Sequence, residues 1–87
     1  MGSYRLVFRK SVAKDLRAIP TRDVRRILST IDTLSENPRG VGCEKLSGQE
    51  RYRVRQGDYR VIYEIQDAQF VVVVAKVAHR GEAYRGR

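Results

Sequence analysis

The stretch RYRVRQGDYRVIYEI, residues 51–65, constrains the fold more than any other part of the chain. Tyrosines and aliphatic residues occupy alternate positions, and arginines fill many of the positions between them. Because successive side chains of a strand point to opposite faces, this pattern predicts two strands, Arg51–Arg55 and Tyr59–Gln66. The residues between them, 56–58, contain a Gly-Asp pair typical of a tight hairpin turn. The stretch therefore predicts an antiparallel hairpin with two chemically different faces.

Alternation assigns the apolar side chains of this hairpin to one face, namely Tyr52, Val54, Tyr59, Val61, Tyr63 and Ile65. It assigns Arg53, Arg55 and Arg60 to the opposite, open face. Like charges that lie side by side repel each other, so such a cluster requires compensation. A bound polyanion would provide it. The alternative is that the arginines are simply solvated, with Glu64 as a local partner.

The remaining elements follow from periodicity. Tyr4–Phe8 alternates like a first strand, and Gln69–His79 contains a nearly continuous apolar run typical of a central strand. Two helices are predicted between them, one after a cap at Ser11 and one after a cap at Thr21, with Pro20 separating them. Their apolar positions recur every three or four residues: Val12, Leu16 and Ile19, then Val24, Ile27, Leu28, Ile31 and Leu34. Residues 39–49 contain three glycines and are expected to form a loop.

These elements predict a single α+β domain spanning residues 1–87, in the order β-α-α-β-β-β. A helical hairpin packs on one face of an antiparallel four-stranded sheet. The last strand is expected to lie between the first strand and the strand Tyr59–Gln66.

The formal net charge of +8 is unevenly distributed. Residues 51–60 and 76–87 each carry a net charge of +3, whereas the residues between them are net acidic. Two basic segments that meet at one sheet indicate a nucleic-acid site, which we favour over a mere solubility device. The predicted RNA-binding residues are Arg51, Arg53, Arg55, Lys76 and Arg85.

Other function classes have little support in the sequence. Cys43 is the only cysteine and His79 the only histidine, so no metal-ligand spacing is present and we expect neither a metal nor another cofactor. No apolar run approaches the roughly 20 residues of a membrane span. The N-terminus has no signal-peptide pattern. We therefore expect a cytoplasmic protein that does not contact membranes.

Taken in order, YRLVFRKSVAKDLRAIP, NPRG, KLSG, YRVRQGDYRVIYEI and VAHRGEAYR make the chain resemble the RelE/ParE superfamily of toxins. The resemblance covers essentially the whole chain. It implies a RelE-like endoribonuclease that cleaves mRNA in the ribosomal A site and so inhibits translation. It also implies three partners: a cognate antitoxin, the 70S ribosome and mRNA.

The resemblance further implies metal-free transesterification through the RNA 2′-hydroxyl. By this resemblance Arg60 holds the scissile phosphate, Arg80 stabilises the transition state, and Tyr84 orients the nucleotide and helps to activate the 2′-hydroxyl. Arg53 and Arg55 stand where RelE-type enzymes often carry lysines. Because arginine does not lose its proton in proteins, neither can be the general base.

Three residues are candidates for that base. Tyr84 ranks first, because neighbouring arginines would lower its pKa. Glu44 and His79 follow about level.

Two other functions stay open at this point. One is a non-enzymatic toxin of the ParE branch that poisons DNA gyrase, although that branch generally lacks the arginine–tyrosine set. The other is a catalytically decayed, RNA-binding toxin homologue.

Overall fold

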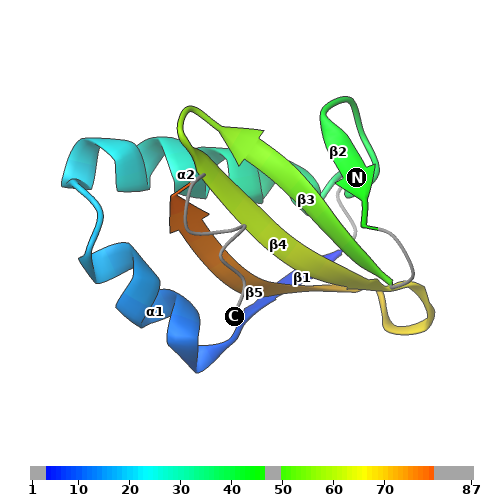
Figure 1. Ribbon diagram of the computed structural model, residues 1–87. Coiled ribbons are helices and arrows are strands. Elements are labelled where there is room, and N and C mark those ends of the chain that lie inside the picture. The colour runs from blue at the N-terminus through cyan, green and yellow to red at the C-terminus, as the bar shows by residue number, and fades with distance from the viewer. Residues whose placement is uncertain (1–3, 47–49, 80–87) are drawn as a thin grey trace.

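The computed structural model describes residues 4–46 and 50–79, which form two helices on one face of a five-stranded sheet (Figure 1). The strand order across the sheet is β1-β5-β4-β3-β2. In chain order the elements are β1 (Arg5–Phe8), α1 (Lys10–Arg17), α2 (Thr21–Leu34), β2 (Cys43–Lys45), β3 (Arg51–Gln56), β4 (Tyr59–Gln66), the 3₁₀ turn η1 (Asp67–Gln69) and β5 (Val71–His79).

The predicted α+β class, the helical hairpin and the central position of the last strand are confirmed. The antiparallel four-stranded sheet is wrong in two respects. First, β1 runs parallel to β5, with Arg5 opposite Val71 and Phe8 opposite Val74. Second, the glycine-rich segment expected to be a loop contributes a fifth strand, β2, whose Glu44 lies opposite Arg53 of β3. This strand has only three residues and is defined by its pairing with β3, so it has no periodicity of its own.

The β3–β4 hairpin has the predicted alternation. Gln56 pairs with Tyr59, so residues 57 and 58 form a two-residue turn. Gly57 has a φ of +60°, a conformation that glycine adopts without steric cost. Within this register Tyr52 lies opposite Tyr63, and their rings stack with centroids 5.7 Å apart on the helix-facing side.

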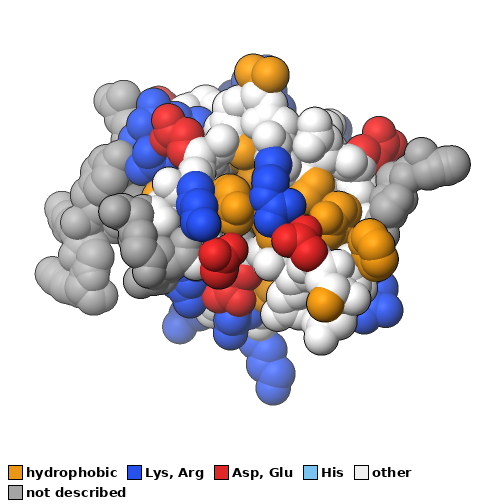
Figure 2. Space-filling view, turned by 90° about the vertical axis from the view of Figure 1, so that its right-hand side faces the viewer, with side chains coloured by type: hydrophobic (Ala, Val, Ile, Leu, Met, Phe, Trp, Pro, Cys, Tyr) orange, Lys and Arg blue, Asp and Glu red, His pale blue; other side chains and the backbone are white. Residues whose placement is uncertain are grey.

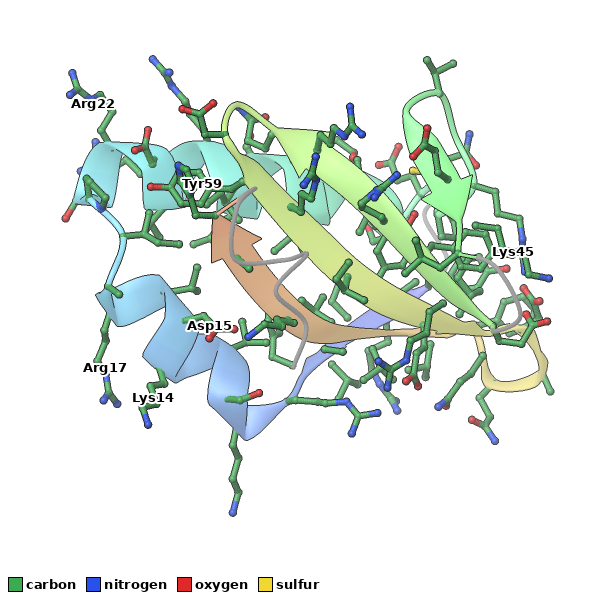
Figure 3. All side chains as sticks on the ribbon, in the orientation of Figure 1. Lys14, Asp15, Arg17, Arg22, Lys45 and Tyr59 are labelled. Atoms are coloured by element: carbon green, nitrogen blue, oxygen red, sulfur yellow. The ribbon has the colours of Figure 1, made fainter. Side chains whose placement is uncertain are left out.

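The core lies between this face and the helices. Its fully buried members come from both layers: Val12, Ile27, Ile31 and Leu34 from the helices, and Val61, Tyr63, Val72 and Val74 from the sheet. The predicted helix caps are wrong, because α1 begins at Lys10 after Arg9 and α2 begins at Thr21 after Pro20, without side-chain capping bonds. Figure 3 shows Lys14 and Arg17 pointing away from the sheet, as amphipathic packing requires.

A polar network that the sequence did not indicate ties the end of α2 to the sheet. Two guanidinium nitrogens of Arg39 donate to the Asp67 carboxylate at 3.1 and 2.8 Å, and its Nε donates to the Tyr52 hydroxyl at 3.2 Å. The Tyr4 hydroxyl also donates to Asp67, at 2.7 Å. These bonds, Arg39 first, lower the pKa of Asp67 to about 2. The network therefore holds β1, η1 and the loop after α2 together through one ionised carboxylate.

Asp67→Asn should lower stability at neutral pH, since it removes the charge that both donors recognise. A carboxyl group with a lowered folded-state pKa contributes stability above its unfolded pKa and loses it as the pH falls through the folded value. The difference in urea midpoint between wild type and Asp67→Asn should therefore be constant above about pH 4 and shrink toward pH 2. Asp32→Asn, on the exposed side of α2, serves as the control. Its urea midpoint should follow that of the wild type as the pH is lowered. A difference that persists unchanged to pH 2 would contradict this role of the network.

Candidate functional site

Three arginines gather on the side of β3 and β4 that faces away from the helices. Arg55 and Arg60 are direct partners in the antiparallel register, and Arg53 lies two residues away on β3, opposite Ile62. Side chains of directly opposed residues lie within about 5.5 Å of each other at Cβ. We call the surface formed by Arg53, Arg55 and Arg60 the arginine face.

The arginine face is less open than the sequence indicated. Arg60 is only 8% exposed, so the expectation of an exposed side chain is wrong there. Its strand, β4, lies in the interior of the sheet, between β3 and β5. The Arg53 side chain is 17% exposed, and the Nε atoms of both residues are buried. Arg55 is exposed. The face thus combines two largely buried arginine side chains with one that reaches solvent.

Glu44 lies at the side of this face. It is the register partner of Arg53, and its carboxylate forms a charge-assisted ion pair with that guanidinium. The hydrogen bond and charge of Arg53 lower the pKa of Glu44, and the charges of Arg55 and Arg60 lower it further. Glu44 is therefore ionised at neutral pH and is a weak proton acceptor.

At the opposite end of the hairpin, two arginines share one carboxylate. Glu64 accepts from Arg9 and from Arg51, both at 3.2 Å, so the predicted RNA-binding residue Arg51 already has a carboxylate partner. On the side of the molecule that carries β2 and η1, acidic and basic side chains lie next to each other (Figure 2). Near the turn of the hairpin, Arg55 and Arg60 lie side by side in the register.

His79 lies on the other side of the sheet, whereas Lys76 lies on β5 opposite Ile62. β5 carries one extra residue opposite the step from Ile62 to Tyr63, and this irregularity reverses the alternation of the residues that follow. As a result His79 pairs with Tyr59, their rings meet edge to face with centroids 5.5 Å apart, and both lie on the helix-facing side. The structure therefore does not bring His79 to the arginine face.

A cavity of about 540 Å³ lies between α1 and the end of β5. The residues that line it include Lys14, Asp15, Tyr59, Lys76 and His79, together with apolar residues. Figure 3 shows Asp15 directed from α1 toward β5. The Lys76 ammonium lies 3.9 Å from the Asp15 carboxylate, so this predicted RNA-binding residue contacts α1.

Comparison with known proteins decides the family. A family model described as "ParE toxin of type II toxin-antitoxin system, parDE" matches residues 6–84. The chain belongs to the RelE/ParE superfamily of toxins. It is 31% identical over 86 residues to toxin RelG of Mycobacterium tuberculosis, covering 94% of this chain and 97% of that protein.

Solved structures agree with this assignment. The archaeal RelE–RelB complex from Pyrococcus horikoshii contains a chain that matches with a TM-score of 0.79 and 35% identity, over 91% of this chain and 97% of that one. The toxin–antitoxin complex RelBE2 from Mycobacterium tuberculosis matches with a TM-score of 0.80 and 27% identity, over 90% and 99%. The fold of these toxins is therefore also the fold of this chain.

Asp15 is a residue of this toxin that the sequence analysis overlooked. β1 pairs with β5 only as far as Val74, and beyond that point the Asp15 carboxylate accepts a 3.0 Å hydrogen bond from the Val77 amide. Asp15 thus takes the place of a neighbouring strand at the last part of the β5 edge, just before Arg80 in the sequence. The sequence offered one signal for this role: Asp15 is an acidic residue three positions after Val12, on the apolar side of the helix.

Arg80, Tyr84 and Arg85 lie outside the described residues. Within residues 4–46 and 50–79, no three His, Cys, Asp or Glu side chains are grouped so that they could hold a metal ion. No helix of the described chain combines the length and apolarity needed to cross a membrane.

The ion pair between Glu44 and Arg53 can be tested through the pKa of Glu44. Arg53→Gln should raise the pKa of Glu44 toward its ordinary value, because Arg53 is the principal cause of its lowered value. A carboxyl-carbon NMR titration would measure this shift. Arg5→Gln, on the distant strand β1, is the control and should leave the titration unchanged. An unshifted Glu44 titration in Arg53→Gln would show that the ion pair is absent in solution.

Proposed function

We propose that this toxin is a metal-free endoribonuclease that cleaves mRNA in the A site of the 70S ribosome and thereby inhibits translation. The observation that carries the proposal is the arginine face, in which the largely buried side chains of Arg53 and Arg60 lie beside the exposed Arg55. Fixed cations placed where negative charge develops lower the barrier to phosphoryl transfer without reorganising during the reaction. The kinship with RelE and RelG toxins supports the same reaction.

In the proposed reaction the 2′-oxygen attacks the adjacent phosphorus, and the bond from phosphorus to the 5′-oxygen breaks. The products are a 2′,3′-cyclic phosphate and a 5′-hydroxyl, after one proton leaves the 2′-hydroxyl and one reaches the 5′-oxygen. Arg60 holds the scissile phosphate, while Arg53 and Arg55 offset the charge of the phosphorane. By family resemblance, Arg80 stabilises the transition state at the leaving oxygen.

We assign proton abstraction from the 2′-hydroxyl to Tyr84. Arg53 and Arg55 keep their protons, and His79 lies on the other side of the sheet. Glu44 is occupied by Arg53 and is too acidic to be an efficient base at neutral pH. This elimination supports Tyr84, whose own role comes from the family resemblance.

The proposed partners follow from the relatives. The two solved relatives described above are complexes of a toxin with its antitoxin, RelE with RelB and RelBE2, and we propose a cognate antitoxin for this chain as well. Arg51, Lys76 and Arg85 are proposed as further contacts to RNA phosphates. The cytoplasm is the compartment in which this toxin would meet ribosomes and mRNA.

Arg60→Ala should reduce mRNA cleavage in a reconstituted translation reaction about 10²–10³-fold, the usual loss when one fixed transition-state donor is removed. Mapping of RNA 5′ ends by primer extension would measure the cleavage. Arg22→Ala removes an arginine that points away from the sheet at the start of α2, and it should cleave normally (Figure 3). Full cleavage by a folded Arg60→Ala variant would refute the assigned site.

The ParE description of the matching family model favours a second candidate, a gyrase poison. A supercoiling assay separates the two functions. Inhibited supercoiling with intact messages would replace the endoribonuclease by the gyrase poison. RNA binding without cleavage or growth arrest would indicate the decayed, RNA-binding homologue.

A further inference from the structure

The pair of Glu44 and Arg53 is asymmetric in a way that bears on how RNA binds. The Arg53 side chain is 17% exposed, whereas that of Glu44 is 60% exposed. Arg53 is held by β3, which pairs on both sides, while Glu44 is carried by the three-residue edge strand β2. The cation is thus fixed in the sheet, and the anion can turn toward solvent.

Carboxylate and phosphate oxygens accept the same charge-assisted hydrogen bonds from a guanidinium group. Glu44 therefore occupies, at Arg53, the position that a phosphate of bound RNA would take. A phosphate and a carboxylate repel each other when they share one guanidinium cluster. The exposed carboxylate is the one that can leave, since exposed ion pairs contribute little stability.

We propose that Glu44 is a built-in competitor of RNA, an anion that covers Arg53 in the free toxin and is displaced by an RNA phosphate. The inference rests on the proposed function, because it requires the arginine face to bind RNA. Displacement involves no covalent step. The hydrogen bond from Arg53 to the Glu44 carboxylate is exchanged for one to a phosphate oxygen, and the Glu44 carboxylate becomes hydrated. Glu44 thereby weakens the binding of any polyanion at Arg53. A ligand must then make more contacts elsewhere to reach the same affinity.

The chain offers a matched control in Glu50. Its carboxylate pairs with the Lys45 ammonium at 3.2 Å, and its side chain is 73% exposed. Replacing Glu50 by glutamine would change the net charge of the protein by the same amount as Glu44→Gln. Lys45 follows Glu44 on β2 but lies opposite Tyr52 rather than an arginine. Glu44→Gln and Glu50→Gln therefore differ in which cation they release, but not in net charge.

The test is the affinity of the purified full-length toxin for a single-stranded 2′-O-methyl RNA oligonucleotide, which cannot be cleaved, measured by fluorescence anisotropy. Glu44→Gln should bind about two- to fivefold more tightly than wild type, the scale of one exposed ion pair. The gain should shrink as salt is added. Glu50→Gln should show less than half of this gain.

Arg60→Ala, measured with the same oligonucleotide, separates the two levels of the proposal. If Arg60→Ala weakens binding while Glu44→Gln binds no more tightly than wild type, the competitor role is wrong and the RNA-binding face stands. Equal gains in Glu44→Gln and Glu50→Gln would also overturn the competitor role, because net charge alone would explain them. If Arg60→Ala binds as tightly as wild type, the proposed RNA site itself fails, and the inference fails with it.

Discussion

The register of the β3–β4 hairpin is the constraint on which the rest of the molecule depends. Closure at Gln56 and Tyr59, with Gly57 at positive φ, fixes which side chains face the helices. A slip of one residue would move the stacked tyrosines into solvent and the arginines into the core. One turn therefore determines both the hydrophobic core and the proposed reaction surface, and the arginines are held in place by the same pairing that buries Tyr52 and Tyr63.

The helices and the edge contacts make that surface usable. α1 and α2 cover only one face of the sheet, which leaves the other to the arginines and to Glu44 (Figure 1). Asp15 satisfies the edge of β5 beyond the end of β1, and Arg39 joins the core tyrosine Tyr52 to Asp67. These polar contacts lie away from the arginine face, so they can stabilise the fold without neutralising the charges proposed to bind RNA.

Strong periodicity explains what the sequence predicted. The tyrosine–arginine division follows from alternation, and the helical hairpin follows from apolar spacing interrupted by Pro20. The predictions that failed concern features that depend on residues outside the local pattern. β2 exists only through its pairing with β3, so the contact between Glu44 and Arg53 had no local signal. The face of His79 is set by one extra residue in β5, and the alternation within β4 gives no sign that Arg60 is buried.

We propose that RNA binds across β3 and β4, on the side away from the helices. Backbone amide chemical shifts of the toxin, titrated with an uncleavable 2′-O-methyl RNA, test it most directly. If RNA binds there, the largest changes should occur at residues 44 and 53–60, with α1 and α2 little affected. Changes confined to the two helices, with β3 and β4 unperturbed, would contradict it.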